Sequence, residues 1–389
     1  MTQKKGLKKS VSKEGIIFLI IFLGVFIGMG SIMGTINMFN TLMETAYSLL
    51  LNTVFYIMAI AVLAGAISAL LSEFGVVSLI NKLLSPLMKP LYDLPGASTI
   101  GVLTTYLSDN PAILTLAEDK GFRRYFKKYQ LPALTNLGTA FGMGLIITTY
   151  MMGQKSPTGE SFILPAIIGN IGAVIGSIVS TRLMLRQTSK IYGKEEMCVQ
   201  DSDTSFDMMK YREIRDGSVG ERFMAAMLEG GESGVQMGLA IIPGVLIICT
   251  LVLMLTNGPS ATGVYTGAAS EGIGLLPWIG EKLQFILVPL FGFQSPEAIA
   301  FPITSLGAAG AAISLVPEML QKGLIGGNEI AVFTAMGMCW SGYLSTHVAM
   351  MDGLKCRELT GKAIFSHTFG GLAAGIVAHF IYLIMSRFI

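Results

Sequence analysis

The chain has 389 residues, of which 52% are hydrophobic and only 13% are charged, and its mean hydropathy is +0.63. Soluble globular proteins carry about 25% charged residues, so this composition excludes that class and indicates a membrane protein. A net charge of +2 gives no basic surface for nucleic acid, and we expect no such partner. The four cysteines are scattered without a C-x-x-C pair, which argues against a disulfide framework, a zinc site or a redox pair.

Seven apolar stretches have the length of about 20 residues that a membrane-spanning helix needs. They are residues 15–34, 48–71, 131–152, 162–185, 235–256, 330–351 and 363–384. The first follows a basic leader, as in a signal peptide, but its apolar core is longer and no A-x-A site follows it. We therefore interpret it as a retained helix and predict an all-α, polytopic protein of the cell membrane with about seven spanning helices.

Two further apolar stretches differ from spanning helices. Residues 76–92 place Lys82, Lys89 and two prolines among leucines, which is typical of a helix in the membrane interface. Residues 94–117 are apolar on both sides of Ser108-Asp109-Asn110-Pro111. A continuous span would place an ionisable group and a proline at the centre of the membrane, whereas two half-helices can use these residues as a turn. We predict a re-entrant hairpin with its tip at residues 108–111.

The sequence contains an internal repeat at an offset of 199 residues. At this offset, residues 75–153 align without a gap with the segment that begins at residue 274, and the hairpin segment 105–112 aligns with residues 304–311. The match predicts a second hairpin and the same order of elements in both halves. We predict an N-terminal helix and loop (1–45), a first repeat (46–187), a connector (188–222) and a second repeat (223–389).

The basic residues indicate an orientation for these repeats. With a cytoplasmic N-terminus, the segments that remain inside contain 23 of the 27 Lys and Arg residues, as the positive-inside rule requires. Each repeat then crosses the membrane three times, so the two copies are inverted. Inverted repeats with paired hairpins are typical of secondary transporters, whose substrate site lies near the midplane between the repeats.

Three short motifs resemble known membrane transporters. Residues 94–100, followed by 111–113, resemble the first hairpin of the nucleoside-recognition (Gate) domain, which also forms the membrane part of ferrous-iron transporters. Residues 291–293 and 305–312 resemble its second hairpin, and residues 108–111 are similar to the hairpin tip of concentrative nucleoside transporters. The resemblance implies the fold and an elevator-type carrier mechanism. By analogy with elevator carriers, we also expect a homo-oligomer.

A GTP-driven iron transporter is not expected. Ser108 stands where the iron transporters carry a cysteine, and the sequence has no G-x-x-x-x-G-K-[ST] motif to bind the nucleotide.

Asp109 is the first candidate for a functional residue. A carboxylate at a hairpin tip attracts a cation and lies beside the positive end of the second half-helix. We predict that Asp109 binds a coupling ion or substrate, with Ser108 and Asn110 adding polar contacts. The alternative is that Asp109 only caps the half-helix that follows.

The second hairpin tip carries no charge. Its turn could hold a polar substrate group with backbone N–H groups near Gly307, with Thr304 and Ser305 beside it. The alternative is tight packing of small residues.

The helices after the hairpins add further candidates. Asn136 and Ser341 lie on polar seams, which either pack helices together or face the cavity beside the hairpins. His347 is either a proton relay or an interfacial hydrogen-bonding group.

The sequence thus predicts a secondary transporter of a small polar solute, nucleoside-like or another small organic molecule, coupled to Na⁺ or H⁺. No catalytic constellation is present in the sequence, so we expect no enzyme and no further cofactor. The expected partners are the substrate and the lipid bilayer. The competing hypothesis is a non-transporting scaffold or accessory protein with the same fold.

Overall fold

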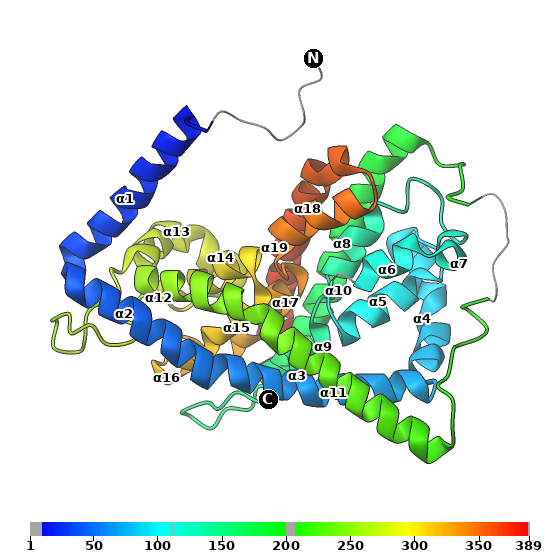
Figure 1. Ribbon diagram of the computed structural model, residues 1–389, viewed down its shortest axis with the longest axis horizontal. Helices are drawn as coiled ribbons and strands as arrows, with labels where there is room; N and C mark the ends of the chain where they lie inside the picture. The colour runs from blue at the N-terminus through cyan, green and yellow to red at the C-terminus, as the bar shows by residue number, and fades with distance from the viewer. Residues whose placement is uncertain (1–9, 111, 200–206, 388–389) are drawn as a thin grey trace.

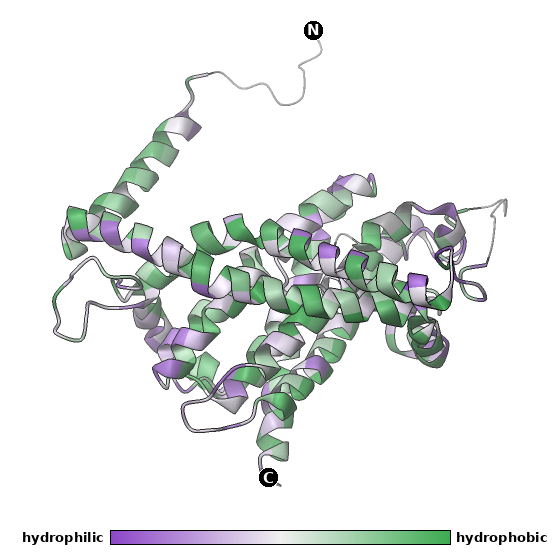
Figure 2. Cartoon of the chain, turned by 60° about the horizontal axis from the view of Figure 1, so that its bottom comes forward, coloured by the Kyte–Doolittle hydropathy of each residue, from purple (hydrophilic) through white to green (hydrophobic). Residues whose placement is uncertain are grey.

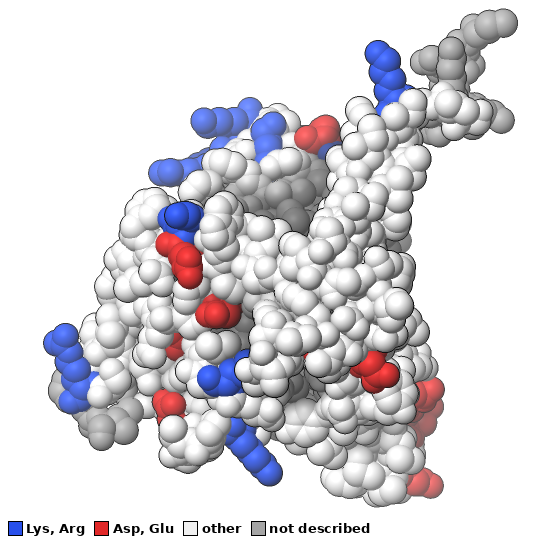
Figure 3. Space-filling view, turned by 90° about the vertical axis from the view of Figure 1, so that its left-hand side faces the viewer, with Lys and Arg blue, Asp and Glu red and all other residues white. Residues whose placement is uncertain are grey.

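The computed structural model describes residues 10–110, 112–199 and 207–387, which form helices and no strand (Figure 1). Within these residues, five helices are long and apolar enough to cross a membrane: Lys13–Met33, Thr35–Glu73, Ile163–Tyr192, Val219–Thr256 and Arg357–Met385. Apolar residues dominate these helices (Figure 2), and the face in Figure 3 has a wide uncharged area. The chain is therefore an all-α polytopic membrane protein, as its composition predicts.

The N-terminal helix stands apart from the rest of the molecule. α1 (Lys13–Met33) projects outward and exposes most of its apolar side chains (Figure 1). After it, α2 (Thr35–Ser48) runs through a π-helical turn, η1 (Leu49–Val54), into α3 (Phe55–Glu73) without interruption. The span expected from residue 48 is thus the second part of a 39-residue helix.

A second long helix crosses the first. It consists of α11 (Val219–Gly244), a π-helical turn η2 (Val245–Cys249) and α12 (Thr250–Thr256). α3 and α11 are antiparallel and meet backbone to backbone. A Cβ on Gly65 would lie 2.3 Å from the carbonyl oxygen of Gly230, and one on Gly234 would lie 2.4 Å from that of Ala61. Small residues therefore permit this crossing, as at other close contacts between membrane helices.

Backbone geometry confirms the internal repeat. α4 (Val76–Tyr92) has the bounds that its sequence predicts, and α13 (Leu275–Phe291) is its equivalent in the second repeat. Residues with positive φ flank both helices: Gly75 and Asp93 for α4, and Gly274 and Gly292 for α13. The two pairs share the offset of 199 residues.

The central helix pair shows that the repeats are inverted. α10 (Ile163–Tyr192) and α19 (Thr360–Met385, after the short η4, Arg357–Leu359) are equivalent at the same offset. Gly172 of α10 faces Ala374, whereas the later Gly176 faces the earlier Gly370. The equivalent helices therefore pack antiparallel along small residues.

The first predicted hairpin is a pair of short helices that fold back on each other. α5 (Ser98–Leu107) precedes α6 (Ala112–Glu118) and the single turn α7 (Lys120–Arg123). A Cβ on Gly101 would lie 2.4 Å from Cδ1 of Ile113, a contact that a straight helix would not allow. Entry of this hairpin into the membrane stays a prediction.

The equivalent segment of the second repeat is also divided. The elements are η3 (Pro296–Ile299), α14 (Ala300–Gly307), α15 (Ala309–Ser314) and α16 (Val316–Gln321). Ala308 has an extended backbone (φ −160°, ψ 119°) and separates α14 from α15. The chain also bends by 78° between α13 and the η3–α14 segment.

Two spans expected to be continuous are broken, so these two predictions are wrong. Residues 131–152 form α8 (Ala133–Thr139) and α9 (Gly144–Met152), and residues 330–351 form α17 (Gly327–Cys339) and α18 (Tyr343–Gly353). In each break one residue has positive φ, Met143 (54°) or Gly342 (62°), again 199 residues apart. A left-handed residue cannot continue a right-handed helix, which explains both interruptions.

Candidate functional site

Four interruptions of the chain come together near the centre of the molecule. We call residues 108–110 tip 1, residues 307–308 tip 2, residues 140–143 break 1 and residues 340–342 break 2. Each tip or break ends one short helix and begins another, so unpaired backbone groups of helix termini point toward this region. Both repeats contribute one tip and one break.

Asn110 joins tip 1 to both breaks. Its side chain is 1% exposed, and its Nδ2 donates a hydrogen bond of 2.6 Å to the carbonyl oxygen of Ser341 in break 2. Its Oδ1 faces break 1, where a Cβ on Gly142 would lie 1.3 Å from it. That oxygen has no hydrogen-bond partner within the described part of the chain. Only glycine at position 142 leaves room for this arrangement.

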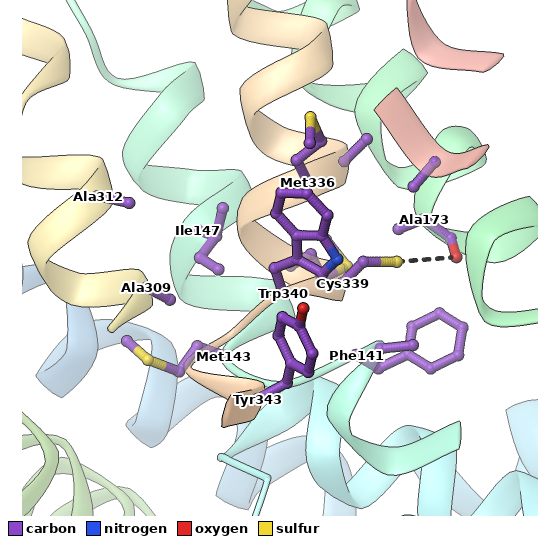
Figure 4. Packing of buried hydrophobic residues seen from close by; sticks show 14 of the residues in the cluster. Phe141, Met143, Ile147, Ala173, Ala309, Ala312, Met336, Cys339, Trp340 and Tyr343 are labelled. Carbon is purple, nitrogen blue, oxygen red and sulfur yellow. Dashed lines mark hydrogen bonds between the residues drawn. The ribbon is translucent and has the colours of Figure 1, made fainter. Parts of the chain in front are cut away.

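Tip 2 contacts break 2 through the backbone. The N–H of Gly342 donates to the carbonyl oxygen of Ser305 (3.0 Å), and a Cβ on Gly342 would lie 3.0 Å from the carbonyl oxygen of Gly307. Figure 4 shows Met143 of break 1 beside Ala309, with the rings of Trp340 and Tyr343 in the same core. The structure thus gathers tips and breaks from both repeats into one centre.

Asp109 and Ser108 lie on the accessible side of tip 1. Within the described residues, the half-buried Asp109 carboxylate accepts one hydrogen bond, from the N–H of Asn110 (2.7 Å), and no ion pair involves it. The Ser108 hydroxyl donates to the carbonyl oxygen of Thr104 (2.6 Å). Ser108 also lines a cavity of about 150 Å³ between tip 1 and the α3–α11 crossing, where Ser68, Ser72 and Ser233 contribute hydroxyl groups.

The hydroxyl groups near tip 2 bond to their own helix. Thr304 donates to the carbonyl oxygen of Ala300 (2.7 Å) and Ser305 to that of Pro302 (2.9 Å), so both side chains are buried and satisfied. Of the candidates in this segment, Ser305 contacts break 2 through its backbone carbonyl, and Gly307 has an exposed backbone that a ligand could contact. This tip therefore offers main-chain rather than side-chain groups.

Asn136 lies in the middle of α8 and belongs to neither a tip nor a break. It is fully buried, and its Nδ2 donates to Ser180 Oγ and to the carbonyl oxygen of Ala363, both at 3.0 Å. Ser180 in turn bonds to Nδ1 of His367, whose Nε2 bonds to the carbonyl oxygen of Cys339, the residue before break 2. Asn136 thus belongs to a buried network that holds α8, α10 and α19 around break 2.

His347 lies deep in the protein and is not accessible from its surface. It is 0% exposed, its ring lies 4.7 Å from that of His367 between centroids, and neither of its nitrogens has a partner among the described residues. A neutral imidazole has one donor and one acceptor, so burying both without partners is costly.

The two breaks were not predicted from the sequence, although Gly142 and Gly342 were visible there as possible helix interruptions.

The connector between the repeats is fixed by charged contacts. Glu73, at the end of α3, is buried and accepts from Arg215 and Arg222 at 2.7 Å each. Asp207 accepts from the Tyr125 hydroxyl, which is the main reason why the pKa of Asp207 lies below its usual value. These contacts connect residues 207–222 to α3 and to the segment after the first hairpin.

Comparisons with known proteins identify the fold. No protein-family model matches the sequence, and no curated protein does. The structure is similar to a doubly substituted CNTnw, a concentrative nucleoside transporter, in an outward-facing state (TM-score 0.57, 13% identity, covering 95% of this chain and 86% of that one). It is also similar to CNTnw in an inward-facing substrate-bound state (TM-score 0.52, 13% identity, 94% and 83% covered). The chain therefore has a fold like that of concentrative nucleoside transporters.

Proposed function

We propose that this protein is an ion-coupled secondary transporter of a small polar solute, which binds in the cavity beside tip 1, next to the centre where the tips and breaks of the two repeats meet. The observation that carries this proposal is the hydrogen bond from Asn110 in tip 1 to Ser341 in break 2, across 231 residues of sequence. This hydrogen bond supports a single site to which both repeats contribute residues, as expected of a transporter.

The chemistry of the centre suits a polar solute and a cation. Non-helical backbone at membrane depth is tolerated where it is covered by protein or lines a wet cavity. The unpartnered Oδ1 of Asn110 is an oxygen ligand of the type that hard cations prefer, and the carboxylate of Asp109 adds a negative charge beside it. We assign ion coupling to these two residues.

The cavity beside Ser108 supports a neutral substrate. Its lining contains four serines, from tip 1, α3 and α11, together with small and apolar residues and no charged side chain. Such a surface can hydrogen-bond to hydroxyl groups, as a nucleoside-like molecule would require, without stabilising a net charge. The fold likeness to nucleoside transporters agrees with this class of substrate.

An elevator mechanism fits the arrangement of long and short helices. The crossed α3 and α11 would form the fixed part, in a homo-oligomer, and the tips and breaks would move past it with the substrate. The cavity lies between these two parts, where such a movement would open access.

Transport by purified protein in liposomes tests the proposal. A thermal-shift screen of nucleosides, nucleobases, amino acids and carboxylates, with and without Na⁺, first identifies a ligand. Uptake of that ligand is then measured under an imposed Na⁺ or H⁺ gradient. We expect accumulation with one gradient and loss of accumulation in Asp109→Asn.

Asp352→Asn is the matched control, because Asp352 is an exposed carboxylate at the end of α18, where it pairs with Arg357 at 3.5 Å. Wild-type uptake by Asp109→Asn would refute the assigned role of Asp109. If no compound is stabilising or accumulated, the non-transporting scaffold becomes the better hypothesis.

A further inference from the structure

A positively lined cleft lies apart from the central site, where the end of α4 meets the last turns of α10. Its volume is about 330 Å³, within the range of ~300–1,000 Å³ that is usual for small-molecule sites. Its polar lining comprises Asp93, Tyr129, Arg182, Arg186, Ser189 and Lys194. Three of these six residues are basic and one is acidic.

Two of the basic groups in the cleft are available to a ligand. Arg182 is held by hydrogen bonds from its Nε and Nη2 to the carbonyl oxygens of Leu91 (2.8 Å) and Pro90 (2.6 Å), which fix α4 to α10. The side chains of Arg186 and Lys194 are exposed and form no hydrogen bond or ion pair within the described parts of the chain. Both can therefore donate to an anion without breaking an existing contact.

The neighbouring acidic groups do not neutralise the cleft. Asp93 is paired with Lys89. Glu195 and Glu196, which follow Lys194, are paired with Lys127 and Lys128 respectively. The charges of Arg182, Arg186 and Lys194 thus remain uncompensated by these carboxylates.

An apolar stripe leads along α4 to the cleft. Four exposed leucines follow one another at intervals of four residues: Leu79 (67% exposed), Leu83 (74%), Leu87 (48%) and Leu91 (38%). The stripe ends at Leu91, whose carbonyl oxygen accepts from Arg182 of the cleft. An amphipathic helix with such a face lies in the membrane interface, so lipid chains can cover the leucines.

We propose that this cleft binds the phosphate-bearing headgroup of an anionic phospholipid, with the acyl chains along the leucine stripe of α4. Arg186 and Lys194 donate charge-assisted hydrogen bonds to the phosphate oxygens. Basic pockets at the ends of membrane helices are suited to such headgroups. The adjoining apolar stripe favours a lipid over a free phosphate, because a free phosphate has the same negative charge but no acyl chains to cover the leucines.

Lipid binding to the full chain in detergent tests this proposal. Native mass spectrometry would count adducts with dioleoylphosphatidylglycerol and, for comparison, dioleoylphosphatidylcholine. The variant R186Q/K194Q removes both free cations, and K190Q removes a cation from the same helix that does not line the cleft. Because a hydrogen bond to a charged group contributes about 1.5–3 kcal/mol, we expect at least about ten-fold weaker phosphatidylglycerol binding in R186Q/K194Q.

The control K190Q should bind phosphatidylglycerol as the wild type does, and phosphatidylcholine should bind weakly to all three proteins. Equal losses in K190Q and R186Q/K194Q would overturn the proposal, because binding would then follow surface charge in general. Complete competition by inorganic phosphate would overturn the assignment to a lipid and indicate a soluble anion. The melting temperature of R186Q/K194Q without added lipid should equal that of the wild type, which excludes misfolding as the cause.

Discussion

Replacement of Gly142 by alanine tests the contact between tip 1 and break 1. A Cβ at this position would lie 1.3 Å from Oδ1 of Asn110, far inside any permitted contact. Asn110 must then move and lose its bond to the carbonyl oxygen of Ser341. Overpacking costs about 1–3 kcal/mol and an unsatisfied buried group about 1–3 kcal/mol, so we expect Gly142→Ala to destabilise by about 2–6 kcal/mol.

A double-mutant cycle separates the clash from the lost hydrogen bond. Asn110→Ala alone leaves the Ser341 carbonyl unpaired and should cost about 1–3 kcal/mol. The double variant removes the side chain that the new methyl group would strike, so its stability should equal that of Asn110→Ala. Transport should be lost in all three variants, because each one removes the bond that joins tip 1 to break 2.

The free energy of unfolding in mixed micelles and the uptake of substrate into liposomes measure these effects. Gly361→Ala is the control, because nothing lies within 4 Å of a Cβ there, and it should behave as the wild type. Additive costs in the double variant, or full transport by Gly142→Ala, would refute the inferred contact of Asn110 with break 1.

Three further predictions concern other parts of the molecule. Glu73→Gln should lower the melting temperature, because the buried carboxylate holds Arg222 and its loss leaves that cation unpaired; a melting temperature equal to that of the wild type would contradict this. The hydrogen bond from Tyr125 lowers the pKa of Asp207, so its stabilisation of the connector should be complete above pH ~4, the ordinary pKa of an aspartate. This contribution should be lost as the pH falls through the lowered pKa, so limited proteolysis at residues 207–222 should increase only in acid. His347→Phe should leave the melting temperature equal or higher, because it removes two unpartnered buried nitrogens, and a clear decrease would indicate that they have a partner.

Local sequence patterns predicted much of the fold. The prolines and lysines of α4 and the polar residues of tip 1 stand out against apolar surroundings, and the structure places a helix and a fold-back there. The repeat offset was equally visible, because glycines and prolines recur at fixed positions. These signals depend on neighbours in sequence, which is why they could be read without a structure.

The breaks were hidden because their residue types also occur inside membrane helices. Break 1 contains Phe141 and Met143, so hydropathy continues through it, and the aromatic and small residues of break 2 (340–342) are tolerated in a continuous span. The left-handed backbone of Met143 depends on the packing around it, not on its own preference. The bond of Asn110 to Ser341 joins residues 231 apart and depends on the tertiary fold. Such a contact lies beyond any local pattern.

The π-helical turns of the two long helices have a consequence for how they tolerate insertions and deletions. A π turn holds an additional residue relative to an α-helix, and each residue of an α-helix turns the chain by about 100°. Loss of one residue within η1 would therefore convert the π turn into a regular α turn and leave the rotation of α3 relative to α2 nearly unchanged. In a regular α-helix the same deletion would turn Gly65 away from Gly230 by roughly 100°. The π turn η1 thus protects the glycine crossing against a one-residue deletion, and η2 does the same for the second long helix.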